Sequence, residues 1–280
     1  METLLDLNKE YTLELDGKKY HFVYVEPEGI SGRGGSSIVY KAREEDGFKD
    51  YYVIKEFCPH NLIVQRMANG SIFVLDDQKN EYEERKLRAL SESKTVDNLR
   101  HDDEIKNNNP WFLSYGKPIE ANNTLYTVIA TESGDMMSSM IAGNFFKGKS
   151  FLNVCSCVLK ILDALKPIHD QRYLHLDISP DNIHFSDLGI ARLIDYNSAF
   201  RMGDDPTNWM PSYKPGYSAK ELTDHSSTKP PALTFATDLY SVAAIFFRLL
   251  FGRMPEEGDW SNHRKWQLSN ETGYLAGIVD

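Results

Sequence analysis

The sequence contains few cysteines and no long apolar run. Three cysteines occur in 280 residues, and Cys155 and Cys157 lie two positions apart in a predicted helix, where such neighbours point to different faces. Neither a disulfide framework nor a cysteine metal site is therefore predicted. The most apolar stretch, residues 242–251, is interrupted by Arg248, and the N-terminus lacks the basic start and apolar run of a signal peptide. We expect a cytoplasmic chain that meets a membrane only if an anchor follows residue 280.

Basic residues are also scarce. The chain has 31 Lys and Arg against 41 Asp and Glu, which gives a formal net charge of −10. Binding to nucleic acid depends on clustered positive charge, so nucleic acid is not an expected partner. Hydrophobic residues make up 41% of the sequence and aromatic residues 12%, which excludes general disorder. The length suffices for one large domain or two lobes.

The first half of the chain has the pattern of a mostly antiparallel sheet. Asp16-Gly17 and Asn69-Gly70 are typical hairpin turns between runs of apolar and aromatic residues. The predicted strands are residues 11–15, 18–25, 37–42, 51–57, 62–66, 72–75, 111–115 and 125–130.

One helix interrupts this sheet. The apolar spacing predicts it over residues 80–93, with Leu87 and Leu90 on its buried stripe. Residues 95–109 are polar and charged, and we expect them to form a solvated loop.

The second half is helical. Apolar residues recur with a period of 3.6 over residues 154–168, and residues 236–250 form a second apolar helix that should be buried on most sides. The predicted fold class is therefore α+β, with a small β-rich lobe over residues 1–130 and a larger, mainly helical lobe over residues 131–280.

A glycine cluster lies between two predicted strands. Gly32, Gly34 and Gly35 would let backbone amides approach a phosphate closely. A tight turn is the favoured explanation of such a cluster when it is taken alone.

Lys55 lies in an apolar strand, and Glu83 begins the apolar pattern of the helix that follows. A Lys–Glu pair would hold an ammonium group where it neutralises phosphate oxygens. Glu81 and Glu84 compete with Glu83 for this role, and a solvated helix face is the alternative for all three.

The chemically most distinctive segment reads HLDISPDN over residues 175–182 and is followed by DYN at residues 195–197. Predicted strands flank a turn at residues 186–189, so a hairpin should bring Asn182 and Asp195 together at its open end. Two oxygen ligands would meet there, which suits Mg²⁺.

With these segments the chain resembles the eukaryotic-type (Hanks-type) protein kinase family from about residue 30 to its end. PGYSAKE at residues 215–221 looks like the end of an activation segment, and DLYS at residues 238–241 is a further match. KEFCP at residues 55–59 and DISPDN at residues 177–182 are most similar to bacterial serine/threonine kinases. The resemblance implies a two-lobed kinase fold with ATP in its cleft.

The resemblance also implies a role for each candidate residue in the first lobe. Gly32, Gly34 and Gly35 would cover the ATP phosphates, Lys55 would bind them, and Glu83 would position Lys55. The nucleotide contacts that it further implies are Val39, Val53, Ile129, Thr131 and Glu132.

Within that nucleotide site, Ile129 would be the gatekeeper and residues 130–132 the hinge facing adenine. Val53 stands where the family usually has alanine, which would narrow the pocket by about two methyl groups.

In the second lobe, Asp177 would accept the proton of the substrate hydroxyl. Asn182 and Asp195 would hold Mg²⁺, or Mn²⁺ in its place. His175 is expected to be structural, because the mechanism gives it no proton-transfer role.

Three departures from the family pattern stand out. Ser37 replaces the third glycine of the loop, and residues 195–197 read Asp-Tyr-Asn in place of Asp-Phe-Gly. Leu176 replaces the arginine that usually clamps a phosphorylated activation loop, so activation by loop phosphorylation is not the expectation. The residues that could still accept phosphate are Ser198, Thr207, Ser212 and Tyr213.

The chain also ends early for this family. Only 59 residues follow Glu221, so the second lobe is expected to be truncated or abbreviated, with its terminal helices missing. Glu221 would then lack its usual arginine partner, and an unpaired buried carboxylate is destabilising.

Two positions look exchanged. The family usually has lysine two residues after the catalytic aspartate and threonine just before Pro-Gly-Tyr, whereas this chain has Ser179 and Lys214. We hypothesise that Lys214 reaches back and supplies the ammonium group that stabilises the transferred phosphoryl group, with Ser179 as its hydroxyl partner. A solvated loop lysine is the alternative.

Three functions fit the sequence. An active serine/threonine protein kinase is the first, because every residue with a direct chemical role is present. A pseudokinase that binds nucleotide or a partner without phosphoryl transfer is the second, and a kinase-fold enzyme acting on a small molecule is the third. The match over residues 214–221 favours a protein substrate.

Overall fold

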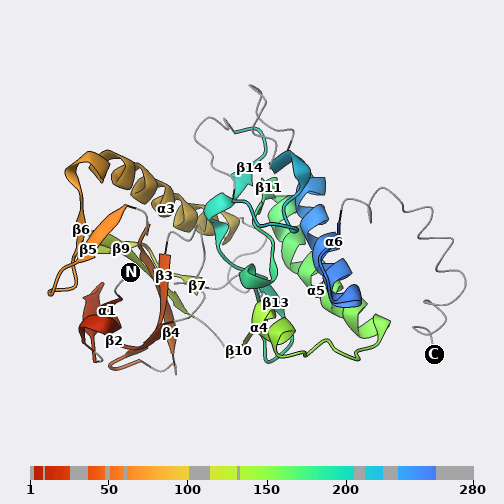
Figure 1. Ribbon diagram of the computed structural model, residues 1–280, viewed down its shortest axis with the longest axis horizontal. Coiled ribbons are helices and arrows are strands. Elements are labelled where there is room, and N and C mark those ends of the chain that lie inside the picture. Colours follow the sequence, from red (N-terminus) through yellow and green to blue (C-terminus); the bar gives the residue numbers. More distant parts are fainter. Residues whose placement is uncertain are drawn as a thin grey trace, which may run out of the picture. The chain divides into compact units, whose positions relative to one another are not determined.

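The structure, a computed structural model, forms two compact units (Figure 1). Unit 1 comprises Met1–Asn98 and Leu113–Glu132, and unit 2 comprises Leu99–Phe112 and Ser133–Asp280. None of the helices in the described residues is long and apolar enough to cross a membrane. The structure describes residues 3–8, 10–25, 37–47, 51–59, 62–100, 114–130, 133–204, 212–222 and 233–256.

Unit 1 is built on a seven-stranded antiparallel sheet with the order β1-β2-β3-β4-β9-β7 and with β8 paired to β9 (Figure 1). Its strands are β1 (Thr12–Leu15), β2 (Lys18–Val25), β3 (Ser37–Glu44), β4 (Tyr52–Phe57), β7 (Ser114–Tyr115), β8 (Ile119–Ala121) and β9 (Thr124–Ala130). Asp16 and Gly17, between β1 and β2, have φ of 53° and 73°, as a two-residue hairpin turn requires. The first predicted hairpin is therefore confirmed.

The second predicted hairpin is confirmed as well. It consists of β5 (Ile63–Arg66) and β6 (Ile72–Val74), which pair antiparallel. Gly70 in its turn has φ 87°, and the side-chain oxygen of Asn69 accepts a hydrogen bond from the backbone of Ser71 at 3.0 Å. This hairpin carries the side chain of Arg66 into the interior of unit 1.

The helix between the sheet strands is longer than predicted. A short 3₁₀ turn, η1 (Asp76–Gln78), leads into α3 (Lys79–Arg100). The loop predicted from residue 95 is therefore wrong as far as Arg100. Val96 and Leu99 are fully buried, and their burial outweighs the polar composition that suggested a loop.

The buried face of α3 also differs from the prediction. Leu87 was expected on the apolar stripe with Leu90, but Leu87 is 65% exposed. Tyr82 is buried, and Leu90 packs against the same core. The side chain of Lys86 is only 10% exposed, so the inward face follows residues 82, 86 and 90.

Unit 2 is organised around two helices, α5 (Phe151–Asp170) and α6 (Phe235–Phe251), which lie side by side (Figure 1). Ser150 caps α5 by accepting a hydrogen bond from the backbone of Asn153 at 3.3 Å. Leu239 on α6 is 45% exposed, but most residues of this helix are buried or half-buried. The predicted burial of this helix on most sides is therefore confirmed.

Short elements complete unit 2 and carry the candidate site. They are β10 (Gly134–Met136), α4 (Met137–Ala142), β11 (Tyr173–Leu174), η2 (Pro180–Asn182), β12 (Ile183–Ser186), β13 (Ala191–Leu193), η3 (Tyr196–Ser198), β14 (Phe200–Arg201) and η5 (Lys220–Leu222).

Candidate active site

The loop that precedes η2 is held in shape by one buried carboxylate. Leu176 has φ 61°, a left-handed conformation that is uncommon for leucine. Asp238 on α6 is fully buried and accepts hydrogen bonds from the backbone N–H groups of His175 and Leu176, each at 2.8 Å. It also lies 2.9 Å from Nε2 of His169. Helix α6 therefore fixes the backbone immediately before Asp177.

Asp177 is the most perturbed acid of this loop. Burial raises its pKa to about 7, and the nearby carboxylate of Asp195 acts in the same direction. Lys214, Asn182 and Ser212 lower the pKa but do not cancel the effect of burial. Among the described residues, no group donates a hydrogen bond to the buried Oδ1 of Asp177. Such an oxygen is suited to a substrate hydroxyl or a cation.

The predicted hairpin brings Asn182 and Asp195 together. Strands β12 and β13 are antiparallel, with Ile183 opposite Leu193. The backbone N–H of Ile194 donates to the carbonyl of Asn182 at 3.0 Å. Asp195 follows directly, so both side chains lie at the open end of the hairpin.

The chemistry of these side chains fits a hard divalent cation. Nδ2 of Asn182 donates to the carbonyl oxygen of Asp177 at 2.8 Å, which leaves Oδ1 of Asn182 as the ligating atom. Asp195 has φ 64°, and its Oδ1 accepts from Nδ2 of Asn197 at 2.8 Å. The carboxylate of Asp195 and the amide oxygen of Asn182 are oxygen donors of the kind that Mg²⁺ and Mn²⁺ prefer.

Lys214 reaches this loop from residues 212–222. Its Nζ donates to Oγ of the fully buried Ser179 at 2.8 Å and lies 3.2 Å from Oδ2 of Asp181. The predicted contact between Lys214 and Ser179 is therefore present. Because Lys214 also lowers the pKa of Asp177, its positive charge acts on the same site.

His175 connects the loop to the end of β13. The imidazole is fully buried, and Nδ1 accepts a hydrogen bond from the backbone of Asp177 at 3.3 Å. Nε2 then carries the proton and faces the carbonyl of Ile194 at 3.2 Å. Burial lowers the pKa of His175, and its ring packs on Tyr196 with centroids 4.9 Å apart. These contacts are those of a structural residue.

In unit 1, four of the predicted nucleotide contacts share one face of the sheet. Lys55 on β4 lies opposite Val39 on β3 and Thr127 on β9. Val53, two residues earlier on β4, lies opposite Ile129. Opposite residues share a face, as do residues two apart along a strand. The ladder therefore places Lys55 beside Val39, Val53 and Ile129.

The predicted role of Glu83 in unit 1 is not supported by its contacts. Glu83, expected to position Lys55, has a 62% exposed side chain whose carboxylate lies 3.9 Å from Nζ of Lys86. That pairing with Lys55 is therefore not found among the described residues, because Tyr82 and Lys86 occupy the inward face of α3. The predicted site residues outside the described residues are Gly32, Gly34, Gly35, Thr131 and Glu132.

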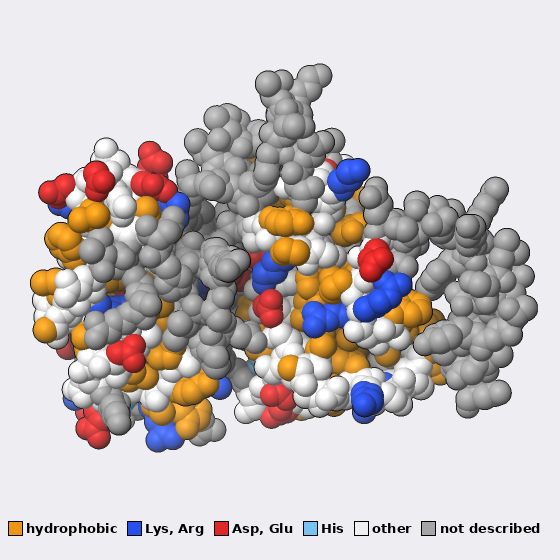
Figure 2. Space-filling model, viewed as in Figure 1, with side chains coloured by type: hydrophobic (Ala, Val, Ile, Leu, Met, Phe, Trp, Pro, Cys, Tyr) orange, Lys and Arg blue, Asp and Glu red, His pale blue; other side chains and the backbone are white. Residues whose placement is uncertain are grey.

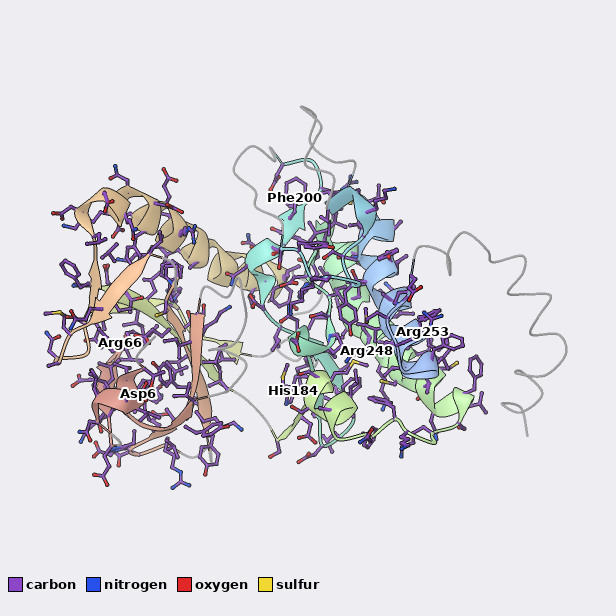
Figure 3. The ribbon with its side chains drawn as sticks, in the orientation of Figure 1. Asp6, Arg66, His184, Phe200, Arg248 and Arg253 are labelled. Carbon is purple, nitrogen blue, oxygen red and sulfur yellow. The ribbon has the colours of Figure 1, made fainter. Side chains whose placement is uncertain are left out.

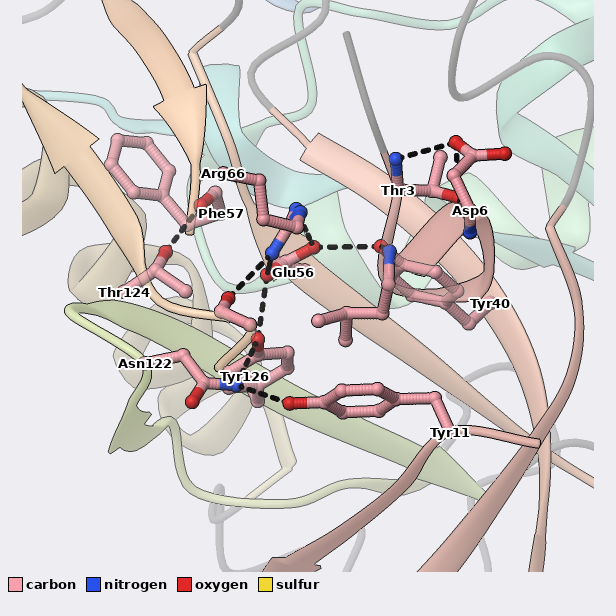
Figure 4. Close-up of polar contacts among 12 residues, drawn as sticks. Thr3, Asp6, Tyr11, Tyr40, Glu56, Phe57, Arg66, Asn122, Thr124 and Tyr126 are labelled. Carbon is pink, nitrogen blue, oxygen red and sulfur yellow. Dashed lines mark hydrogen bonds and ion pairs between the residues drawn. The ribbon is translucent and has the colours of Figure 1, made fainter. Parts of the chain in front are cut away.

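The sequence interpretation missed a buried ion pair on the opposite face of β4 (Figure 4). Glu56 is fully buried, and its two oxygens accept from the guanidinium of Arg66 at 2.9 and 2.8 Å. The hydroxyl groups of Tyr40 and Tyr126 donate to the same carboxylate at 2.8 and 2.6 Å. Burial and the charge of Glu56 raise the pKa of both tyrosines, so both remain donors.

A signal for this ion pair was present in the sequence. Two charged residues, Lys55 and Glu56, stand next to each other in an apolar strand, and alternation places them on opposite faces. One of the two had to face the core. Asp238 was noted as part of a matching segment, but its three hydrogen bonds depend on the loop conformation and could not be read from spacing.

Glu221 also has a partner. Its Oε1 accepts a hydrogen bond from the hydroxyl of Thr237, on the first turn of α6, at 2.7 Å. This contact does not test whether Glu221 lacks its arginine partner, but it gives the half-buried carboxylate one hydrogen-bond donor. Among the candidate phosphate acceptors, Ser198 is buried, Tyr213 is 53% exposed, and Thr207 lies outside the described residues.

Comparison with known proteins identifies the family. The profile described as "Protein kinase domain" matches residues 25–276. The chain belongs to the protein kinase family. The fold predicted for this kinase domain, a β-sheet lobe followed by a mainly helical lobe, is thereby confirmed. The family implies the use of ATP and a divalent metal ion in general.

Individual relatives are distant. The kinase domain is 24% identical over 198 residues to "Citron rho-interacting kinase" of Rattus norvegicus, a match to 69% of this chain and 9% of the relative. It is 27% identical over 238 residues to "Serine/threonine-protein kinase mph1" of Schizosaccharomyces pombe, 81% and 31% of the two chains. "Probable serine/threonine-protein kinase PknB" of Bifidobacterium longum is 26% identical over 145 residues, 47% and 21% of the two chains. The matched part is less than a third of each relative.

Proposed function

We propose that this kinase domain transfers the γ-phosphoryl group of ATP to serine or threonine hydroxyls of protein substrates. The observation that carries the proposal is the buried, unpaired Oδ1 of Asp177, with Asp195 and Lys214 acting on the same carboxylate. A kinase catalytic base needs this setting, because it must accept a hydroxyl proton beside a charged phosphoryl group. The names of the relatives support serine and threonine as acceptors.

In this proposal Asp177 orients the substrate hydroxyl and takes its proton. A pKa of about 7 leaves about half of the carboxylate ionised at neutral pH and makes it a better proton acceptor than an ordinary aspartate. Asn182 and Asp195 hold the Mg²⁺ ion, or Mn²⁺ in its place. When bound, the ion neutralises charge on the ATP phosphates.

Lys214 and Ser179 complete the catalytic set of unit 2. Phosphoryl transfer is accelerated mainly by positioning and charge neutralisation. The ammonium of Lys214, held 2.8 Å from Oγ of Ser179, supplies positive charge beside Asp177. We assign it to the oxygens of the transferred phosphoryl group.

The nucleotide is assigned to unit 1. Lys55 provides the charged contact to the phosphates, and the apolar side chains of Val39, Val53 and Ile129 on the same sheet face suit an adenine ring. The proposal extends to Gly32, Gly34, Gly35, Thr131 and Glu132 on the basis of the family pattern alone.

The deciding experiment measures transfer of labelled γ-phosphate from ATP, with Mg²⁺ or Mn²⁺, to a generic protein substrate. Asp177→Ala should lower the rate by more than about a hundredfold, since a general base contributes 10²–10⁴. The matched control is Asp187→Ala, an exposed aspartate in the turn after β12, which should keep the parent rate. Phosphoamino acid analysis of the product identifies the acceptor.

Two results would contradict the proposal. Transfer that survives in Asp177→Ala removes the assigned base. Thermal stabilisation of the parent by ATP and Mg²⁺ without any transfer favours a pseudokinase.

A second measurement tests the metal ligands without relying on activity. Asp195→Asn should lose the Mg²⁺-dependent part of the thermal shift that ATP produces, because one carboxylate ligand is replaced by a neutral amide. An unchanged shift would show that Asp195 does not hold the ion.

A further inference from the structure

Residues 212–222 touch the catalytic loop through Lys214 and continue into a tight turn. The backbone N–H of Tyr217 donates to the carbonyl of Lys214 at 3.0 Å, Pro215 occupies the second position, and Gly216 has φ 82°. These are the features of a type II turn. A Cβ atom on Gly216 would lie 2.5 Å from Cε of Met254. The hydrogen bond that closes this turn links the position of Tyr217 to that of Lys214.

Tyr217 is anchored on α6. It is buried, its carbonyl accepts a hydrogen bond from Oγ of Ser241 at 2.8 Å, and its hydroxyl bonds to the guanidinium of Arg248. The guanidinium also stands over the ring, 5.9 Å from its centroid. Lys214 is tied into the same turn, because its N–H donates to Oγ of Ser218 at 2.8 Å.

Arg248, which forms the α6 side of this anchor, is half-buried. Figure 3 labels Arg248 and Arg253 on and just after the C-terminal half of α6, and Figure 2 shows Lys and Arg side chains among hydrophobic ones over this part of the unit. Arg253 stacks on Phe247 with its Cζ 5.0 Å from the ring centroid. Arg248 links this part of α6 to Tyr217 through the hydrogen bond to the tyrosine hydroxyl.

The catalytic groups of unit 2 differ in how they are held. Asp177 and Asn182 belong to the loop that Asp238 fixes through the backbone. The ammonium of Lys214 reaches the loop at the end of a flexible four-carbon side chain, whose rotamer freedom is large. Its presence beside Ser179 depends on where the turn is anchored.

We propose that the docking of Tyr217 on α6 regulates the site by controlling whether the ammonium of Lys214 is in place. Tyr217 and Arg248 are positioning residues in this scheme, and Lys214 is the catalytic residue through which they act. The site is complete while the turn is docked and lacks its ammonium when the turn leaves α6. This regulation rests on the proposed function.

A double-mutant cycle on Tyr217→Phe and Lys214→Met tests the proposal, with kcat measured at saturating ATP and protein substrate. Loss of one hydrogen bond should make Tyr217→Phe about three- to tenfold slower, with KM for ATP unchanged. In the Lys214→Met background, Tyr217→Phe should cause no further loss, since coupled residues are not additive. Equal losses in both backgrounds, or no loss in the parent, would overturn the proposal.

Matched variants separate docking from general damage. Tyr213→Phe makes the same chemical change at an exposed tyrosine of the same segment and should leave kcat unchanged. Arg248→Gln breaks the contact from the α6 side and should reproduce the effect of Tyr217→Phe. The Tm of each variant must stay well above the assay temperature. An effect of Tyr213→Phe as large as that of Tyr217→Phe would contradict a specific role for docking.

Exchanging the two residues provides a rescue. In Ser179→Lys with Lys214→Thr the ammonium is carried by the catalytic loop, so kcat should return toward the parent value and Tyr217→Phe should lose its effect. If Asp177→Ala abolishes transfer but Lys214→Met is fully active, this inference and the catalytic assignment of Lys214 are wrong, whereas phosphoryl transfer with Asp177 as the base stands. If transfer does not depend on Asp177, the proposed function is wrong, and so is this inference, which rests on it.

Discussion

Among the described residues, each unit of this kinase domain buries one carboxylate completely, and the two are satisfied in opposite ways. In unit 1, Glu56 is surrounded by side chains, the guanidinium of Arg66 and the hydroxyls of Tyr40 and Tyr126. In unit 2, Asp238 accepts mainly from the backbone of the loop that leads to Asp177. One carboxylate joins strands of a core, and the other sets the shape of a catalytic loop.

Because the two carboxylates are bonded to different groups, their removal should change different properties, stability in one case and activity in the other. A buried ion pair contributes to stability chiefly because removal of one partner leaves the other charge uncompensated. A carboxylate bonded to backbone N–H groups holds a strained conformation, here the left-handed Leu176, that the loop would leave otherwise. Damage to Glu56 should therefore appear as instability of unit 1, and damage to Asp238 as lost activity.

The largest expected effect is that of Glu56→Gln. Removing this charge leaves Arg66 buried without a counter-ion, which costs about 3–5 kcal/mol. The free energy of opening, measured by amide hydrogen exchange, should fall at Ile54 and Tyr126 in unit 1 and stay constant at Ile161 in unit 2. Glu14→Gln, at an exposed position of β1, is the control. A loss of protection spread equally over both units would contradict this division.

The next residue along β4 should show the reverse behaviour. Lys55 lies on the opposite face of the strand from Glu56, so Lys55→Met should leave hydrogen exchange in unit 1 unchanged. Phosphoryl transfer should fall by about 10²–10³, because a preorganised charge on the reacting phosphates is worth about 3–4 kcal/mol. Lys19→Met, at an exposed position of β2, should keep the parent rate. More than about a tenth of the parent rate in Lys55→Met would reject the assigned role.

Local signals in the sequence predicted those parts of the fold that depend on neighbouring residues. Both hairpins follow from Asp16-Gly17 and Asn69-Gly70, since these dipeptides accept the backbone angles that the turns need. The hairpin that joins Asn182 to Asp195 was also predicted. The contact between Lys214 and Ser179 was predicted because the lysine and the hydroxyl residue that the family usually has at these two positions are exchanged.

Tertiary packing decided what the sequence did not reveal. The end of α3 and the exposure of Leu87 depend on which face of the helix meets the core, and Tyr82 with Lys86 determines that face. Glu221 accepts a hydrogen bond from the hydroxyl of Thr237, which is sixteen residues away and is not indicated by the spacing. The buried pair of Glu56 and Arg66 depends on a hairpin folding back over β4.

An intermediate effect is expected for Asp238→Asn. The amide can accept one of the two backbone hydrogen bonds, but its NH₂ group opposes the other N–H donor, at a cost of about 1–3 kcal/mol. We expect kcat to fall about ten- to a hundredfold, with faster amide exchange at His175 and Leu176. Unit 1 should be unaffected, and Asp163→Asn on the exposed side of α5 should behave as the parent. Unchanged kcat with faster exchange would show that the loop geometry does not limit the reaction.

The smallest expected effect concerns the N-terminal helix α1 (Leu4–Leu7), which covers the network of Glu56. Leu4 is fully buried, and its N–H donates to the hydroxyl of Tyr40 at 3.2 Å. Asp6 closes the cap of this helix, because its carboxylate accepts from the backbone and hydroxyl of Thr3 at 2.7 and 2.9 Å. These hydrogen bonds lower the pKa of Asp6 below its usual 3.8. A depressed pKa adds stability above the unfolded value and loses it as the pH falls through the folded value.

The parent should therefore be more stable than Asp6→Asn at pH 6, by less than about 1 kcal/mol, since the carboxylate is largely solvated. This advantage should shrink as the pH falls below about 4, because the protonated carboxyl and the amide then carry the same charge. Urea unfolding of both proteins at about pH 6, 4.5 and 3.5, values that bracket the usual pKa of an aspartate, measures the difference in the free energy of unfolding. A constant difference over this range would show that α1 is held by the burial of Leu4 alone, and that its cap does not contribute to the stability of unit 1.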